Sequence, residues 1–166
     1  MSTTDASPIR VSGLHVLDEH VNLQEPIVID VAGSDVTIAF ARRQREGVMM
    51  AIHPTTLESR VANTITYPDR PKSNKPPYLS PGSVSVPLAH GTMTIWSDEA
   101  SGRVHAQTFD VNGAARGEPV LVSPADMDVV GVPRAATADG EHVVVAFFAS
   151  RLDGFEIVTA SLEPAP

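Results

Sequence analysis

Charged and aromatic side chains gather in the stretches between the predicted strands, and their chemistry suits ligand binding. Arginine binds carboxylates and phosphates through paired N–H groups, acidic side chains accept hydrogen bonds, and tyrosine or tryptophan stacks on apolar ligand faces. The predicted ligand-binding residues are Arg42, Arg43, Arg45, Tyr67, Tyr78, Trp96, Asp98, Glu99, Arg151 and Asp153. These residue types suit recognition, and they contain no catalytic set.

Patterns that indicate catalysis or metal binding are weak. His15 and His20 lie five residues apart beside two acidic residues in a predicted loop, but two solvated loop histidines are the simpler interpretation. The segment Asp110–Glu118 resembles a calcium loop only faintly, and its Asn-Gly pair predicts a tight hairpin instead. The sequence contains no Gly-x-Ser-x-Gly motif. We therefore predict no catalytic residue, no metal site and no cofactor.

The composition limits the classes of protein to which this chain can belong. The chain has 166 residues, a net charge of −8 and no cysteine. A negative surface repels nucleic-acid phosphates and anionic membranes, so neither is an expected partner. Met1–Pro8 lacks the plan of a signal peptide, and the longest apolar run, Val143–Ala149, is too short to cross a bilayer. The compartment stays open, and the absence of cysteine favours the cytoplasm slightly.

Three internal repeats are the strongest signal in the sequence. In each, a glycine turn opens a β-branched strand that ends at an aromatic residue, and a second glycine opens another strand. These strands, each the second in its repeat, run with their leading glycines over Gly33–Phe40, Gly91–Trp96 and Gly140–Phe147. Short runs of β-branched residues between turns indicate antiparallel strands, so each repeat predicts four of them.

The repeats define one all-β domain, residues 1–166. They span about 26–66, 83–123 and 133–162. The last repeat lacks a fourth strand, while Ile9–Ser12 near the N-terminus resembles the fourth strand of the second repeat, Val120–Ser123. Because a bare sheet edge invites aggregation, we expect Ile9–Ser12 to complete the third sheet.

The repeats resemble the blades of bacterial β-propeller proteins. The stretches that carry the resemblance are Val104–Asp110, Gly113, Gly117, Val120–Ser123, Pro133, Gly140 and Val143–Phe147. Propellers have four to eight blades, so the resemblance implies that a second copy of the chain completes the ring. A β-trefoil, which also has three repeats of four strands, is the alternative and closes as a monomer.

The resemblance implies a fold and no activity, so function rests on the loops. The turns between first and second strands are short and alike, whereas the loops at the other edge differ in length and charge, which favours that edge as the binding face. We expect Phe40, Trp96 and Phe147 to fill equivalent core positions. A basic loop, 70–75, and an acidic loop, 17–25, could meet across a subunit boundary.

These observations predict a non-enzymatic binding module, lectin-like or an assembly subunit. Its expected partners are a second copy of itself and a glycan or protein ligand. The alternative is a glycosidase-like hydrolase that draws two carboxylates from different blades.

Overall fold

The computed structural model describes residues 9–23, 26–42, 46–66, 82–98 and 100–164, and every regular element in them is a β-strand. The β-branched residues between glycine turns account for this, because they fit a pleated, half-buried surface. The strands are β1 (Ile9–Asp18), β2 (Val28–Ala32), β3 (Asp35–Arg42), β4 (Glu46–Ile52), β5 (Ser59–Thr66), β6 (Ser83–Leu88), β7 (Gly91–Asp98), β8 (Arg103–Phe109), β9 (Ala115–Leu121), β10 (Val129–Thr137), β11 (Val143–Arg151) and β12 (Gly154–Pro164). Within these residues no helix has the length and apolarity that a membrane span requires.

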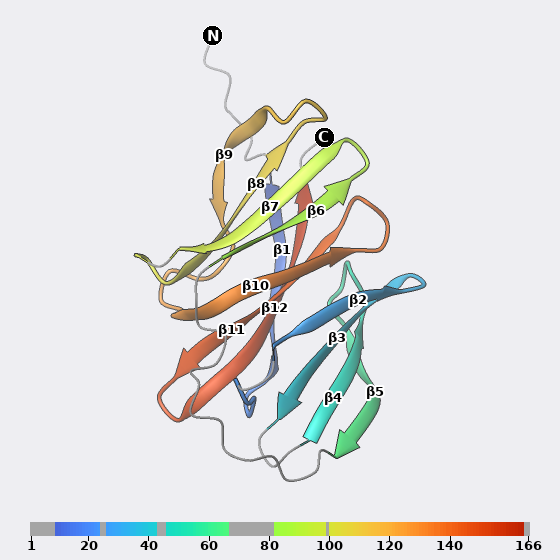
Figure 1. Cartoon of the computed structure of the whole chain (residues 1–166), viewed down its shortest axis with the longest axis vertical. Coiled ribbons are helices and arrows are strands. Elements are labelled where there is room, and N and C mark those ends of the chain that lie inside the picture. The colour runs from blue at the N-terminus through green and yellow to red at the C-terminus, as the bar shows by residue number, and fades with distance from the viewer. Residues whose placement is uncertain (1–8, 24–25, 43–45, 67–81, 99, 165–166) are drawn as a thin grey trace.

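The strands form three four-stranded antiparallel sheets, as the repeats predict (Figure 1). Their orders are β2-β3-β4-β5, β6-β7-β8-β9 and β1-β12-β11-β10. The first two sheets each come from one continuous stretch of chain. The third takes its edge strand, β1, from the N-terminal part of the sequence. This confirms the prediction that an N-terminal strand completes the third sheet. The all-β class and the three four-stranded sheets are thus confirmed.

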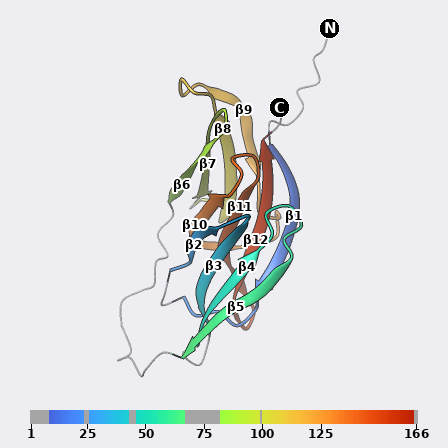
Figure 2. The ribbon, with the colours of Figure 1, turned by 90° about the vertical axis from the view of Figure 1, so that its right-hand side faces the viewer.

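β1 pairs with β12 over a longer stretch than the predicted Ile9–Ser12 (Figure 2). The strand continues to Asp18, with a register shift between Val11 and Gly13. A bulge of this kind inserts an extra residue and breaks the alternation of apolar and polar residues that marks a strand in a sequence. The predicted end of the strand was therefore too early, and His15 lies in β1 instead of a loop.

The sheet that contains both ends of the chain lies between the other two (Figure 1). On one face of β11, Val144 and Ala146 join the core shared with β2–β5; on the other, Val145 and Phe147 join the core shared with β6–β9. The unbroken apolar run Val143–Ala149 explains this position, because a strand that is apolar on both faces needs cover on both. Within the described residues the sheets form a stack and not a closed ring.

The two flanking sheets each bury one face and leave the other open. In β7, Met93 and Ile95 are fully buried against the central sheet, and Trp96 alternates with them, half-buried, on the opposite face. Phe40 and Phe147 are 3% and 0% exposed, so the expectation of equivalent core positions is right for these two and wrong for Trp96. Successive side chains of a strand point to opposite faces, so the burial of Met93 and Ile95 places Trp96 on the outward face.

Candidate functional site

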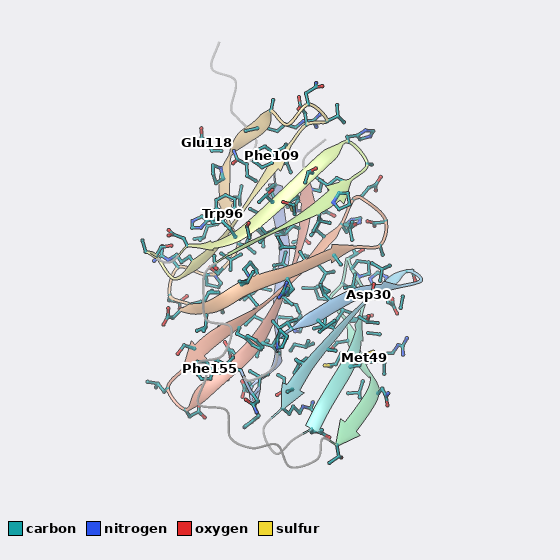
Figure 3. All side chains as sticks on the ribbon, viewed as in Figure 1. Asp30, Met49, Trp96, Phe109, Glu118 and Phe155 are labelled. Carbon is teal, nitrogen blue, oxygen red and sulfur yellow. The ribbon has the colours of Figure 1, made fainter. Side chains whose placement is uncertain are left out.

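The outward side of the sheet β6–β9 carries aromatic and uncharged polar side chains together. We call it the open face of β6–β9, and its residues are Ser83, Ser85, Pro87, Thr92, Thr94, Trp96, His105, Gln107, Phe109 and Leu121. They alternate along their strands with buried residues of the core, among them Val86, Ile95 and Val104. Trp96 and Phe109 are labelled on this sheet in Figure 3.

Strand pairing arranges these residues in three rows across the sheet. The first row places Trp96 between Ser83 and His105. The second places Thr94 between Ser85 and Gln107, and the third places Thr92 between Pro87 and Phe109. The sheet therefore has an aromatic row at each end and a polar row between them.

The Trp96 ring stacks on the imidazole of His105. Their ring centroids lie 5.7 Å apart with an interplanar angle of 20°. Nδ1 of His105 is buried and has no hydrogen-bond partner within the described structure. Stacking on Trp96, and not a hydrogen bond at Nδ1, therefore orients the imidazole ring, and the pair presents one continuous aromatic surface.

The middle row is held by hydrogen bonds. The hydroxyl oxygens of Ser85 and Thr94 lie 2.9 Å apart. Nε2 of Gln107 donates to the carbonyl of Gly117 at 2.8 Å, where β9 bulges away from β8. These contacts fix the side chains and leave donor and acceptor capacity, because a hydroxyl has two lone pairs and an amide has two N–H groups and a carbonyl oxygen.

A pocket of about 600 Å³ adjoins the third row, where the turns β6–β7 and β8–β9 meet. It is lined by Leu88, Ala89, Gly91, Thr92, Thr94, Phe109, Asp110, Val111 and Gly113. Gly91 has a φ of 141°, and a Cβ at this position would lie 2.0 Å from the carbonyl oxygen of Phe109. Only glycine lets β7 approach β8 this closely at the rim of the pocket.

The carboxylate of Asp110, at the rim of this pocket, is engaged by hydrogen bonds within its own turn. It accepts hydrogen bonds from the backbone N–H groups of Ala114 at 2.9 Å and Asn112 at 2.8 Å, which lower its pKa. Gly113 follows with a φ of 82°, as a tight Asn-Gly turn requires. The predicted hairpin is thus present in place of a calcium loop.

Two of the four predicted ligand-binding arginines, Arg42 and Arg151, bind carboxylates of their own chain. Arg42 Nε lies 2.5 Å from Asp18, and Arg42 also contacts Glu46 at 3.2 Å. These bonds hold the end of β1 against the end of β3. Asp18 of the acidic segment 17–25 is thus engaged within its own chain, while the basic loop 70–75 lies outside the described residues, so the predicted contact between the two loops stays a prediction.

Arg151 does the same at the end of β11. It contacts Glu19 at 2.6 Å, Glu156 at 3.1 Å and Asp153 at 3.7 Å. Like Arg42, it connects the segment after β1 to a neighbouring strand end. Both arginines have local structural partners and lie away from the open face of β6–β9.

The other predicted residues divide into two groups. Asp98 shapes the β7–β8 turn: it accepts hydrogen bonds from the hydroxyl of Ser101 at 2.8 Å and from the N–H of Ala100 at 3.0 Å, which lower its pKa. The second group lies outside the described residues: Arg43, Arg45, Tyr67, Tyr78 and Glu99. Of the predicted residues that the structure describes, Trp96 lies on the open face, and Asp98 follows it on the same side of β7.

Sequence reasoning missed most of the open face. It singled out none of His105, Gln107, Phe109, Thr94 and Ser85 as ligand-binding residues. The signal was the alternation in β6, β7 and β8, where polar or aromatic residues occupy every second position between buried apolar ones.

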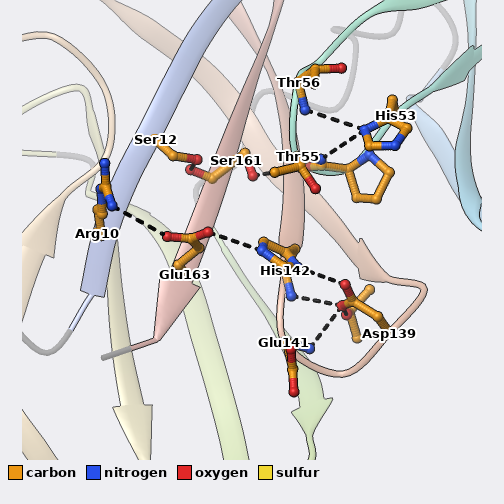
Figure 4. Close-up of polar contacts among 12 residues, drawn as sticks. Arg10, Ser12, His53, Thr55, Thr56, Asp139, Glu141, His142, Ser161 and Glu163 are labelled. Carbon is orange, nitrogen blue, oxygen red and sulfur yellow. Dashed lines mark hydrogen bonds and ion pairs between the residues drawn. The ribbon is translucent and has the colours of Figure 1, made fainter. Parts of the chain in front are cut away.

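A second polar cluster surrounds His142, at the end of the central sheet where the β10–β11 loop lies (Figure 4). His142 Nδ1 lies 2.6 Å from Asp139, and Nε2 lies 2.9 Å from Glu163 on β12. Glu163 also lies 3.9 Å from Arg10 on β1. The imidazole thus connects the β10–β11 loop to the strand pair that joins both ends of the chain.

This arrangement favours a protonated His142. The hydrogen bond to Asp139 and then that to Glu163 raise the pKa of His142. Partial burial alone would raise the pKa of Asp139, but N–H donors of His142 and Glu141 outweigh it and lower that pKa to about 2. An imidazole held between two carboxylates suits a structural clamp, since both of its ring nitrogens are already engaged.

We expect this clamp to make stability depend on pH. A raised pKa in the folded state means that the contribution of His142 is fully present below its ordinary pKa of 6.5 and is lost as the pH rises through the raised value. His142→Gln should therefore lower the melting temperature at pH 5.5 and change it little at pH 9. The loss should be on the order of 1 kcal/mol or less, because the cluster is partly exposed. Equal losses at both pH values would contradict the clamp.

No cluster of three or more potential metal ligands occurs among the residues that the structure places. His15 and His20 belong to β1 and to the segment after it, and no third ligand joins them there.

Comparisons with known proteins add little. No protein-family model matches the chain, and no curated protein matches it. One similar solved structure is a crystal structure of a protein of unknown function from Dyadobacter fermentans, with 12% sequence identity and a TM-score of 0.38. The match covers 90% of this chain and 40% of that one, so this chain spans less than half of that structure. The site therefore rests on its own geometry.

Proposed function

We propose that this protein is a non-enzymatic, lectin-like binding module whose open face of β6–β9 holds an uncharged glycan. The observation that carries the proposal is the aromatic surface of Trp96 and His105 beside the fixed polar row of Ser85, Thr94 and Gln107. Binding sites typically combine apolar or aromatic area with a few placed polar groups.

This face offers the two kinds of contact that a sugar ring makes, stacking and hydrogen bonding. A sugar presents an apolar C–H face, which stacks on an aromatic ring, and hydroxyl groups around its edge. Hydroxyl and amide side chains pair with those groups because each both donates and accepts hydrogen bonds. Trp96 would take the flat face, and the middle row would take the edge.

Charge supports an uncharged ligand. Asp, Glu, Lys and Arg make up 19% of the sequence, and none of them lies in the three rows; on this side of β7 and β8, Asp98 and Arg103 follow beyond the first row. The net charge of −8 also works against an anionic ligand. A neutral glycan fits better than an acidic or phosphorylated one.

Assembly is the second candidate function. Three separate four-stranded sheets agree better with blades of a propeller than with a trefoil, and we infer that they are blades. A ring would close if a second copy covered the open face with its own β2–β5 sheet, where Val28 and Met49 are 57% and 37% exposed. That dimer would bury the glycan site, so light scattering separates the two: a monomer supports the lectin and a compact dimer supports the ring.

The hydrolase alternative has less support. It needs two carboxylates that converge on one pocket. The described lining of the pocket includes a single carboxylate, Asp110, which the turn already occupies. Asp139 and Glu163 lie close together elsewhere, but His142 stands between them.

Wild-type protein on an array of neutral, acidic and branched glycans should bind neutral glycans. Trp96→Ala should weaken that binding by about tenfold or more, since it removes the stacking surface and releases His105. Trp96→Phe keeps a ring and should retain most of the affinity, and Leu152→Ala, a fully exposed turn residue, is the matched control. An array that stays silent for the wild type would exclude the lectin function.

A further inference from the structure

We propose that the glycan is an extended, linear chain of neutral sugars that lies along β7 and β8, from Trp96 to the pocket beside Phe109. This inference rests on the proposed function, and it adds the shape of the ligand, its direction and the place of its end.

The distance between the two aromatic rows requires a chain. Trp96 and Thr92, which faces Phe109, are four residues apart on one strand, so the rows are separated by about 14 Å at the rise of an antiparallel strand. A monosaccharide reaches one row at a time. Only an oligosaccharide contacts both aromatic rows together.

The direction follows from the order of the rows. Along the strands, a ligand meets Trp96, then the hydroxyl and amide of Thr94 and Gln107, then Phe109. Across the strands, a ligand on the middle row would meet polar side chains alone, and one on the first or third row would miss the amide of Gln107. A chain of sugars alternates apolar faces and hydroxyl edges along its length, and the strand direction offers both in turn.

The open face has a boundary at each end. Beyond the first row, Asp98 on β7 lies in register with Arg103 on β8. The carboxylate of Asp98 accepts hydrogen bonds from Ala100 and Ser101 of its own turn. At the other end, Thr92 and Phe109 of the third row line the pocket, which extends to the two turns. The carboxylate of Asp98 is therefore engaged within its own turn, whereas the pocket can receive a terminal sugar. The structure therefore places a chain end beside Phe109 and Val111.

The shape of the sheet favours an extended chain. Trp96, Thr94 and Thr92 lie on one strand and face one side, so the contacts follow a nearly straight line. A chain that coils would leave this line after the first contact. We therefore expect glycans with extended backbones to bind better than coiled ones.

The test is calorimetry with cello-, manno-, xylo- and chito-oligosaccharides, and with malto-oligosaccharides as the coiled contrast, each from monosaccharide to hexasaccharide. Affinity should rise at least tenfold with length in one extended series and then level off. Phe109→Ala should remove most of this gain and leave monosaccharide binding almost unchanged. Val111→Trp is the second variant, because Val111 is 78% exposed and a larger side chain there fills the pocket without disturbing the core.

Each outcome has a meaning. Affinity that does not change with chain length, or a length gain that survives both Phe109→Ala and Val111→Trp, overturns this inference and leaves the lectin function standing. The same holds if only malto-oligosaccharides or branched glycans bind. If the wild type binds no glycan on the array, the lectin function itself fails.

Discussion

Deletion of residues 1–12 is expected to unfold the protein or leave it aggregated. The deletion removes Ile9, which is 2% exposed, and Val11, which packs against the same core. It also strips the partner from the last residues of β12, Leu162–Pro164, which then form an uncovered sheet edge. The combined loss is comparable with the whole stability of a domain, ~5–15 kcal/mol. Circular dichroism melting and size-exclusion chromatography would measure it.

A pair of point variants keeps this prediction testable if the deletion variant cannot be purified. Ile9→Asp buries a charge in the core and should lower stability by several kcal/mol. Arg10→Asp, one residue on, changes a side chain that is 78% exposed and should matter far less. A deletion variant that melts like the parent would show that β1 is not paired with β12.

Truncating either face of the central sheet is expected to be almost as damaging. Phe147 and Ile157 are both 0% exposed, but Phe147 contacts the core under β6–β9 and Ile157 the core under β2–β5. Phe147→Ala should cost about 3–5 kcal/mol and Ile157→Ala about 2–5 kcal/mol, from lost burial and the cavity left behind. Urea denaturation of both variants would give these values.

Comparing the stability losses of Phe147→Ala and Ile157→Ala tests whether both faces of the central sheet are covered. If the central sheet were covered on one side only, one of the two substitutions would be nearly neutral. Leu152→Ala serves as the control for loss of an aliphatic side chain, because Leu152 is fully exposed and should change stability by less than about 0.5 kcal/mol. A neutral Ile157→Ala would disprove the stack of three sheets.

Much of the fold was predictable because glycines and β-branched runs mark strands locally. The repeats located the strands, and the likeness of Ile9–Ser12 to Val120–Ser123 identified the exchanged edge. The order of the sheets was harder, because it depends on which faces are buried. The evidence was present in the unbroken apolar run Val143–Ala149, whose meaning is tertiary: such a strand needs neighbours on both sides.

The candidate site was less predictable, because charge and ligand chemistry are poor guides to which side of a sheet a residue faces. Arg42 and Arg151 look available in the sequence, yet loops from distant positions bring Asp18 and Glu19 to them. Trp96 was identified as a possible stacking residue, but its neighbours across the sheet follow from register, which a single sequence specifies only indirectly.

The pairing of β1 with β12 also bears on how the protein is made. Val11 and Leu162 are neighbours in the sheet but are separated by nearly the whole length of the chain, so the ribosome must finish both before the contact forms. Until then, the central sheet that covers the apolar sides of both flanking sheets is incomplete. Pairing over such separations is slow, and transiently exposed strands aggregate. The nascent chain should therefore depend on chaperones for longer than a protein of similar size whose sheets close locally.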